Sequence, residues 1–110
     1  MKGEILRGGA AALAAALFAV AGPAKAAEDA GAKAFARHCV ACHGDGPEAV
    51  GTQQLARTRG KDKALLAGRK DLPPDYVRAI VRNGLKAMPS FVPGALPDAE
   101  LAAIAAYVTR

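Results

Sequence analysis

Apolar residues in the second half of the chain recur every three to four positions, which is the spacing of one face of an α-helix. The first such stripe consists of Tyr76, Val77, Ile80 and Val81. A proline pair at positions 73 and 74 blocks a helix before the stripe and suits the first turn of one that follows. Asn83-Gly84 ends the stripe with residues typical of a helix C-terminus. We therefore predict a helix over residues 74–83.

A second stripe lies near the C-terminus and consists of Leu101, Ile104, Ala105 and Val108. It begins near Pro97, and Asp98 and Glu100 fall in its first turn, where the helix dipole favours acidic residues. Upstream, residues 30–38 form a shorter helical pattern in which Gly31 and Phe35 lie four apart on one face. The pattern therefore predicts a first and a last helix as well.

The middle of the chain has no comparable stripe. Gly44-Asp45-Gly46-Pro47 breaks the helical pattern, and glycines follow at positions 51, 60 and 68. We predict an irregular segment here, in which Asp62 caps one or two helical turns through Leu66. The sequence lacks the alternation of apolar and polar residues that indicates strands. It therefore predicts an all-α fold of about four short helices.

The first 26 residues have the pattern of a secretory signal peptide. Lys2 and Arg7 precede an apolar run over residues 10–21, and Ala24-Lys25-Ala26 places small residues at both positions recognised for cleavage. The run has 12 residues, fewer than the roughly 20 that span a bilayer. We predict cleavage after Ala26, which leaves residues 27–110 as a single periplasmic domain with no membrane anchor.

The most specific chemistry lies in the segment C-V-A-C-H, which contains Cys39, Cys42 and His43. Two thiols three positions apart and followed at once by histidine form an attachment site for c-type haem. Each sulfur can add to one vinyl group of the porphyrin, and the adjacent imidazole can then ligate the iron. The sequence therefore predicts one covalent haem c with His43 as an axial ligand.

The second axial ligand in such sites is commonly a methionine or another histidine. The chain has two methionines, and Met1 is the initiator. Met88 lies 45 residues after His43 and is followed by Pro89, which stiffens the backbone beside it. A lone methionine is usually a filler of the core, but beside a haem motif Met88 is the predicted second iron ligand.

Three other interpretations of the cysteines are less favoured. A structural zinc site needs four ligands around a tetrahedron, and every Cys and His of the chain is crowded into positions 38–43. A thiol-disulfide oxidoreductase would use Cys-x-x-Cys in a βαβ setting, for which the sequence shows no strands. A disulfide between Cys39 and Cys42 would close too small a loop to constrain the unfolded chain. His38 precedes the attachment turn and is predicted to be a surface residue.

Size and charge refine this interpretation. A domain of 84 residues with no tryptophan has a marginal core of its own, and a large apolar haem would complete it. Residues 27–110 contain 12 Lys and Arg against 9 Asp and Glu, a net charge of +3, and we expect no nucleic-acid partner. The basic residues of segment 57–70 either steer an acidic partner or are simply a solvated surface.

The residues resemble the class I c-type cytochromes over essentially all of the chain after the signal. Gly31 and Phe35 in the first helix match one half of that family's helix crossing, and Ile104 and Tyr107 in the last helix match the other. The resemblance implies a small class I cytochrome c fold wrapped round one haem. It also implies a carbonyl that accepts a hydrogen bond from His43. The family usually has Gly-Pro there, whereas this chain has Gly51-Thr52; the Thr52 carbonyl is available, and the sequence leaves open which carbonyl accepts this bond.

A narrower resemblance links segments 51–55, 69–77, 81–84 and 88–91 to the small cytochrome subunits of bacterial flavocytochromes that oxidise para-alkylphenols. It implies that a separate flavoprotein subunit carries FAD and oxidises the phenol. This chain would then be a subunit that accepts electrons and is not itself catalytic. It would pass electrons to a copper protein or another cytochrome. The alternative is a free diffusible cytochrome that serves several partners.

Two surface roles are left open by the sequence. Ala87, Pro89 and Phe91 are candidates for an apolar docking rim around the haem edge, although Phe91 could equally be core beneath the haem. One of the arginines at positions 57, 69 and 82 is expected to pair with a haem propionate.

Overall fold

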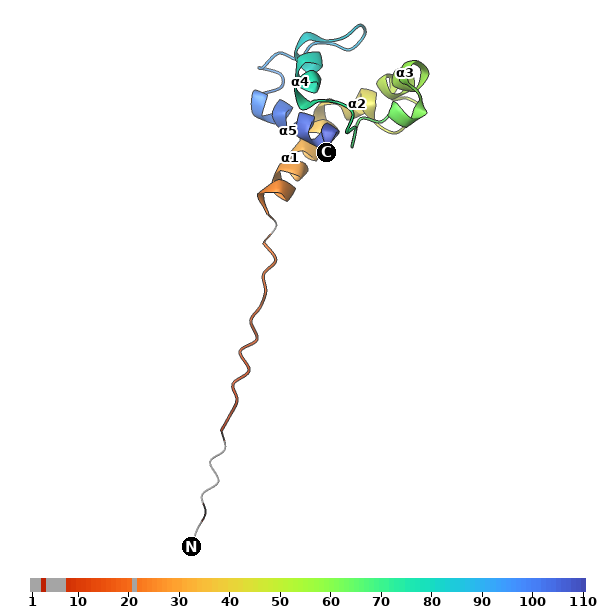
Figure 1. Ribbon diagram of the computed structural model, residues 1–110. Coiled ribbons are helices and arrows are strands. Elements are labelled where there is room, and N and C mark those ends of the chain that lie inside the picture. Colours follow the sequence, from red (N-terminus) through yellow and green to blue (C-terminus); the bar gives the residue numbers. More distant parts are fainter. Residues whose placement is uncertain (1–2, 4–7, 21) are drawn as a thin grey trace.

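The structure is a computed structural model that describes residues 3, 8–20 and 22–110. Within these residues the fold is all-α, as predicted, and the helices form one body around a crossing of the first and last (Figure 1). The elements are α1 (Pro23–His38), α2 (Val40–His43), α3 (Val50–Arg59), a 3₁₀ turn η1 (Lys61–Lys63), α4 (Pro74–Asn83) and α5 (Asp98–Thr109).

The crossing of α1 and α5 is the main packing contact of the fold. A Cβ added to Gly31 would lie 2.3 Å from the Ala103 carbonyl oxygen and 2.7 Å from Tyr107 Cβ. The two backbones therefore approach as closely as they do because residue 31 has no side chain. Phe35 packs beside Tyr107, with ring centroids 5.5 Å apart. The predicted crossing of the first and last helices is confirmed.

The hydrophobic core lies between α1, α4 and α5. Its buried members are Ala34, Phe35, Val81, Leu96, Leu101, Ile104 and Val108. Both apolar stripes contribute to it, and the bounds of α4 and the start of α5 agree with the sequence prediction. Phe91 packs against this core while Ala87 and Pro89 are exposed, so Phe91 serves the core and the other two remain candidates for a docking rim.

Helix α3 lies in a stretch for which the sequence predicts an irregular segment. Gly51 lies inside the helix, where glycine costs about 1 kcal/mol relative to alanine. A Cβ at this position would lie 2.8 Å from His43 Cε1 and 2.7 Å from the Cys42 carbonyl oxygen. The helix also bonds to the segment before it, since Thr52 Oγ1 donates to the Gly44 carbonyl at 2.8 Å. Contacts of α3 with residues 42–44 thus outweigh the low helix propensity of glycine at position 51.

The predicted capping role of Asp62 is wrong. The residue that precedes η1 is Gly60, with φ of +98°, and Asp62 lies inside the 3₁₀ turn without a side-chain capping bond. A positive φ favours glycine over aspartate at this position. Backbone geometry, rather than a side-chain cap, therefore begins the turn.

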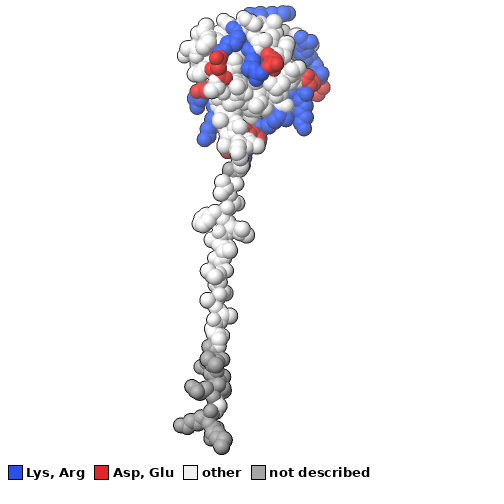
Figure 2. Space-filling view, turned by 60° about the vertical axis from the view of Figure 1, so that its left-hand side comes forward, with Lys and Arg blue, Asp and Glu red and all other residues white. Residues whose placement is uncertain are grey.

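The N-terminal part of the chain lies apart from the helical body. Residues 8–20 form no helix or strand and extend away from it as an uncharged segment (Figures 1 and 2). Leu13, Leu17 and Phe18 are almost fully exposed there. Lys2, Arg7 and Ala21 of the predicted signal lie outside the described residues. α1 begins at Pro23 rather than at residue 30, and no helix among the described residues is long and apolar enough to cross a membrane.

Candidate functional site

The motif turn is built by the end of α1 and by α2. Cys39 closes α1, with its N–H donating to the Phe35 carbonyl at 2.9 Å. The next helical turn returns the His43 N–H to the Cys39 carbonyl at 2.8 Å. Residues three apart on a helical turn share one face, so Cys39 and Cys42 lie on the same side of the chain. Both are free thiols, Cys39 half-buried against the core and Cys42 exposed.

The environment of Cys39 is unfavourable for thiol redox chemistry. Burial, and next the neighbouring Cys42 thiol, raise the pKa of Cys39 to about 11. A thiolate is the nucleophile in disulfide exchange, and redox-active cysteines have a lowered pKa. The Cys39 thiol is therefore protonated at neutral pH, which argues against the oxidoreductase interpretation.

His43 is set in place by the start of α3. Burial lowers the pKa of His43 below its usual range, which favours the neutral imidazole that a metal requires. Its Nδ1 lies only 3.0 Å from where a Cβ of residue 51 would stand, so Gly51 allows α3 to pack against the ring. The absence of a side chain at Gly51 therefore allows α3 to fix the His43 ring by close contact.

The predicted carbonyl acceptor for His43 is not present. Nδ1 is buried and has no hydrogen-bond partner among the described residues. Thr52, the expected supplier of the carbonyl, lies in the first turn of α3. Its carbonyl accepts no hydrogen bond from His43 Nδ1. A buried ring nitrogen without a partner is costly in an apolar setting.

Met88 is presented by a tight turn after α4. The Leu85 N–H donates to the Met88 carbonyl at 3.1 Å, and the Met88 N–H donates to the Leu85 carbonyl at 2.9 Å. Lys86 takes a φ of +53° within this turn. The turn folds back over Gly84, where a Cβ would lie 2.9 Å from the Met88 carbonyl oxygen. Gly84, with φ of +75°, thus lets the methionine return toward α4.

One cavity of about 350 Å³ brings the two predicted iron ligands together, since His43 and Met88 both line it. Most of its other lining side chains are apolar and come from α3, α4, α5 and the loops between them: Leu55, Leu66, Leu72, Val77, Ile80, Val81, Leu85 and Val108. An apolar chamber with an imidazole and a thioether in its wall suits a porphyrin that carries iron. The His43 ring is held at this wall by its close packing against Gly51 of α3. The residues present therefore fit a haem.

The cavity also has a basic side. Arg59, Lys63 and Arg69 line it, with Asp71 as a lone acidic neighbour. Arg69 bonds Asp71 through Nε at 2.6 Å and Nη2 at 2.7 Å, and donates through Nη1 to the Lys63 carbonyl at 2.7 Å. This bonding to Arg69 holds the pKa of Asp71 well below its usual range. The sequence had already grouped these basic residues in segment 57–70, but only the fold shows which of them face the cavity.

Of the three arginines considered as propionate partners, only Arg69 lines the cavity. Arg57 is exposed and donates to Gln54 Oε1 at 3.1 Å. Arg82 is directed toward the loop between α4 and α5, where it bonds the carbonyls of Phe91 and Leu96. Arg69 is therefore the candidate that the cavity favours among the three.

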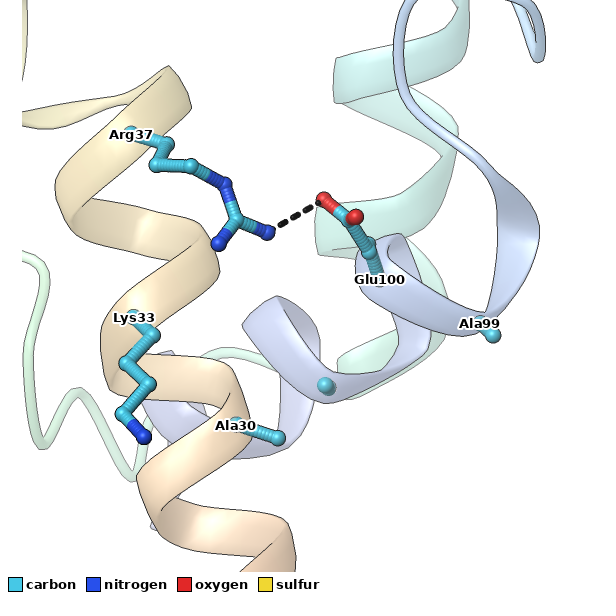
Figure 3. Close-up of a pocket in the computed structure, with 6 residues that line it drawn as sticks. Ala30, Lys33, Arg37, Ala99 and Glu100 are labelled. Atoms are coloured by element: carbon cyan, nitrogen blue, oxygen red, sulfur yellow. Dashed lines mark ion pairs between the residues drawn. The ribbon is translucent and has the colours of Figure 1, made fainter.

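His38 is half-buried rather than a free surface residue. Its Nε2 lies 2.9 Å from Glu100 Oε2, and Arg37 Nη2 lies 3.1 Å from the same oxygen. A hollow of about 340 Å³ lies beside these side chains, and Figure 3 shows it between α1 and α5. It is lined by Ala30, Lys33, Arg37, Ala99, Glu100 and Ala103. The hollow contains none of the predicted site residues, and His38 is engaged with Glu100.

Comparisons with known proteins agree with this site. Residues 26–108 match the family described as cytochrome c oxidase, cbb3-type, subunit III. The chain is also 42% identical over 96 residues to cytochrome c6 of Picosynechococcus sp. (strain PCC 7002). That alignment covers 84% of this chain and 80% of the relative.

Proposed function

Because this chain belongs to the cytochrome c family, whose members bind one haem c covalently, we propose that Cys39 and Cys42 form its thioether bonds and that His43 and Met88 are its axial ligands. The observation that carries the proposal is the single cavity that both His43 and Met88 line. The two thiols share one face of the turn that ends in His43. The chain is an electron-transfer protein rather than an enzyme.

When bound, haem supplies a reversible one-electron couple between ferric and ferrous iron. His43 and Met88 would both hold the iron, which would leave no coordination position for a substrate. The apolar wall formed by α3, α4 and α5 excludes water, and an environment of this kind together with a methionine ligand raises the reduction potential. Arg59, Lys63 and Arg69 supply positive charge for the haem propionates. The protein's residues therefore hold and tune the group, and they transfer no proton.

The family relation to cytochrome c6 favours a diffusible carrier that exchanges electrons with more than one partner. Charges on the body are mixed, since Figure 2 shows basic and acidic side chains interspersed on the face in view. A face of this kind is compatible with brief encounters with several proteins. A copper protein or another cytochrome is a suitable acceptor.

A second candidate is a subunit of a flavocytochrome that oxidises para-alkylphenols, with FAD on the partner chain. It is supported by the sequence resemblance of segments 51–55, 69–77, 81–84 and 88–91. All four segments contribute to the cavity wall, because Leu55, Arg69, Tyr76, Val81 and Met88 line it.

We also propose that the chain is exported to the periplasm with cleavage after Ala26. The match to the family begins at residue 26, and the apolar side chains of residues 8–20 make no part of the core. A segment of this composition, left outside the fold, is typical of a removable signal.

Purification from a periplasm competent in haem attachment tests these proposals. A diffusible carrier is expected to purify as a monomer that starts at Ala27 and is reduced at similar rates by unrelated donors, such as a reduced flavin and a small ferrous complex. Co-purification of a larger FAD protein at fixed stoichiometry, with rapid reduction by that protein alone, would instead establish the subunit. A chain without covalent haem would contradict both.

A further inference from the structure

Arg82 lies at the C-terminal end of α4 and connects three parts of the chain. Its Nη1 donates to the Phe91 carbonyl at 2.9 Å and to the Leu96 carbonyl at 2.8 Å, and its Nη2 bonds the Asp98 carboxylate. The side chain is 22% exposed. A planar guanidinium carries five N–H donors in a rigid fork, which lets one side chain satisfy two carbonyls and a carboxylate at once.

The acceptors of Arg82 all follow the turn that carries Met88. Phe91 follows Met88 by three residues, whereas Leu96 and Asp98 mark the entry to α5. The Phe91 N–H donates to the Val81 carbonyl at 2.9 Å, beside Arg82 on α4. At the other end of the segment, the Gly84 N–H donates to the Ile80 carbonyl at 2.7 Å. Both ends of the segment 84–91 are thereby fixed to the last turn of α4.

The two carbonyls that Arg82 bonds lie in a partly buried part of the fold outside the cavity, whereas its partner Asp98 is exposed. Leu96 is completely buried, and Phe91 packs against the core. A carbonyl in such surroundings that loses its donor is costly, so removing Arg82 penalises the closed loop directly. Lysine could donate to one or two of these acceptors but lacks the fork.

We propose that Arg82 is a positioning residue for the axial ligand, which holds the loop of Met88 closed against α4 and so keeps the thioether on the iron. The inference rests on the proposed function, in which Met88 is that ligand. It concerns local opening of the loop, because two of the three acceptors of Arg82, the Phe91 and Leu96 carbonyls, lie in the segment between α4 and α5.

Loop opening can be measured with an external ligand. Imidazole binds ferric iron only after Met88 leaves, so its apparent affinity is the intrinsic affinity multiplied by the fraction of open loop. A residue that stabilises the closed loop therefore lowers the affinity for imidazole. Global destabilisation by a residue far from the loop leaves this affinity unchanged.

The experiment is an imidazole titration of the ferric holoprotein, followed by absorption. Loss of charged hydrogen bonds in Arg82→Met is expected to raise the imidazole affinity at least about tenfold, and Arg82→Lys gives an intermediate value. Arg78→Met is the matched control, because Arg78 lies one turn earlier on α4 and bonds only the exposed Asp75. Ala36→Gly, at an exposed site of α1, lowers helix stability away from the loop. Both controls are expected to stay within about twofold of the wild type.

Arg82→Met with an affinity within twofold of the wild type would overturn the inference, as would an equal rise in Ala36→Gly. If Arg82→Met does not accumulate, Arg82→Lys carries the same test against Arg78→Lys. If the spectrum of Met88→Ala is the same as that of the wild type, the ligand assignment in the proposed function is instead overturned. The two failures are thus distinguishable.

Discussion

Replacing Cys39 and Cys42 together with alanine is expected to give a colourless chain without a cooperative unfolding transition. Both thioether bonds are lost, and the apolar cavity of about 350 Å³ is left without its contents. Cavities cost about 24 cal/mol per Å³, which corresponds to about 8 kcal/mol. This figure is a ceiling because the cavity is partly open, but it matches the roughly 5–15 kcal/mol that stabilises a typical domain. Circular dichroism during heating measures the outcome.

The single replacement Cys42→Ala is the control, since Cys42 is exposed and Cys39 can still form one thioether bond. It is expected to yield a coloured, folded protein. A double variant that is colourless but helical, with a sharp thermal transition, would contradict the role assigned to haem in the core. It would show instead that the chain folds by its own packing without haem.

Gly31→Ala is expected to destabilise the holoprotein by about 2 kcal/mol, within the range of about 1–3 kcal/mol that overpacking costs. Helix propensity alone predicts the opposite sign, because alanine stabilises a helix interior by about 1 kcal/mol relative to glycine. The clash decides the result: the new Cβ would lie 2.3 Å from a backbone oxygen of α5, and backbone cannot rotate away as a side chain can. Denaturation in guanidinium chloride measures the change.

Ala36→Gly on the same helix separates propensity from packing. Ala36 is exposed, so its replacement is expected to cost about 1 kcal/mol through propensity alone. If packing governs position 31, both the loss and the gain of a methyl group on α1 are destabilising. A stabilised Gly31→Ala protein would show that the helices separate at little cost.

Much of the fold could be predicted because its signals are local. The proline pair, the apolar stripe and Gly84 define α4 within the sequence itself, and Pro97 with Asp98 does the same for the start of α5. Helix α3 was missed because Gly51 is read locally as a breaker. Glycine stands at position 51 because α3 contacts the His43 ring there, and this contact follows only from the packing of α2 against α3.

Part of the candidate site could likewise be predicted from the sequence, and part depends on the fold. The spacing of Cys39, Cys42 and His43 is readable in the sequence, and the fold brings Met88 to the same cavity as His43. The arginines could not be sorted in advance, because their roles depend on which side of α4 and of the loops they face. Arg69 faces the cavity, whereas Arg82 faces the loop that carries Met88.

Absorption spectra of the wild type and Met88→Ala test whether His43 and Met88 ligate the iron of a covalent haem. We expect a c-type spectrum that survives acid extraction of haem in both proteins. It also predicts a weak far-red ferric band, from sulfur bound to iron, that is present in the wild type and absent in Met88→Ala. The variant should have a lower reduction potential, because axial ligands tune haem potentials over about 0.8 V. A far-red band that persists without Met88, or a colourless protein with a reversible disulfide between Cys39 and Cys42, would contradict the claim.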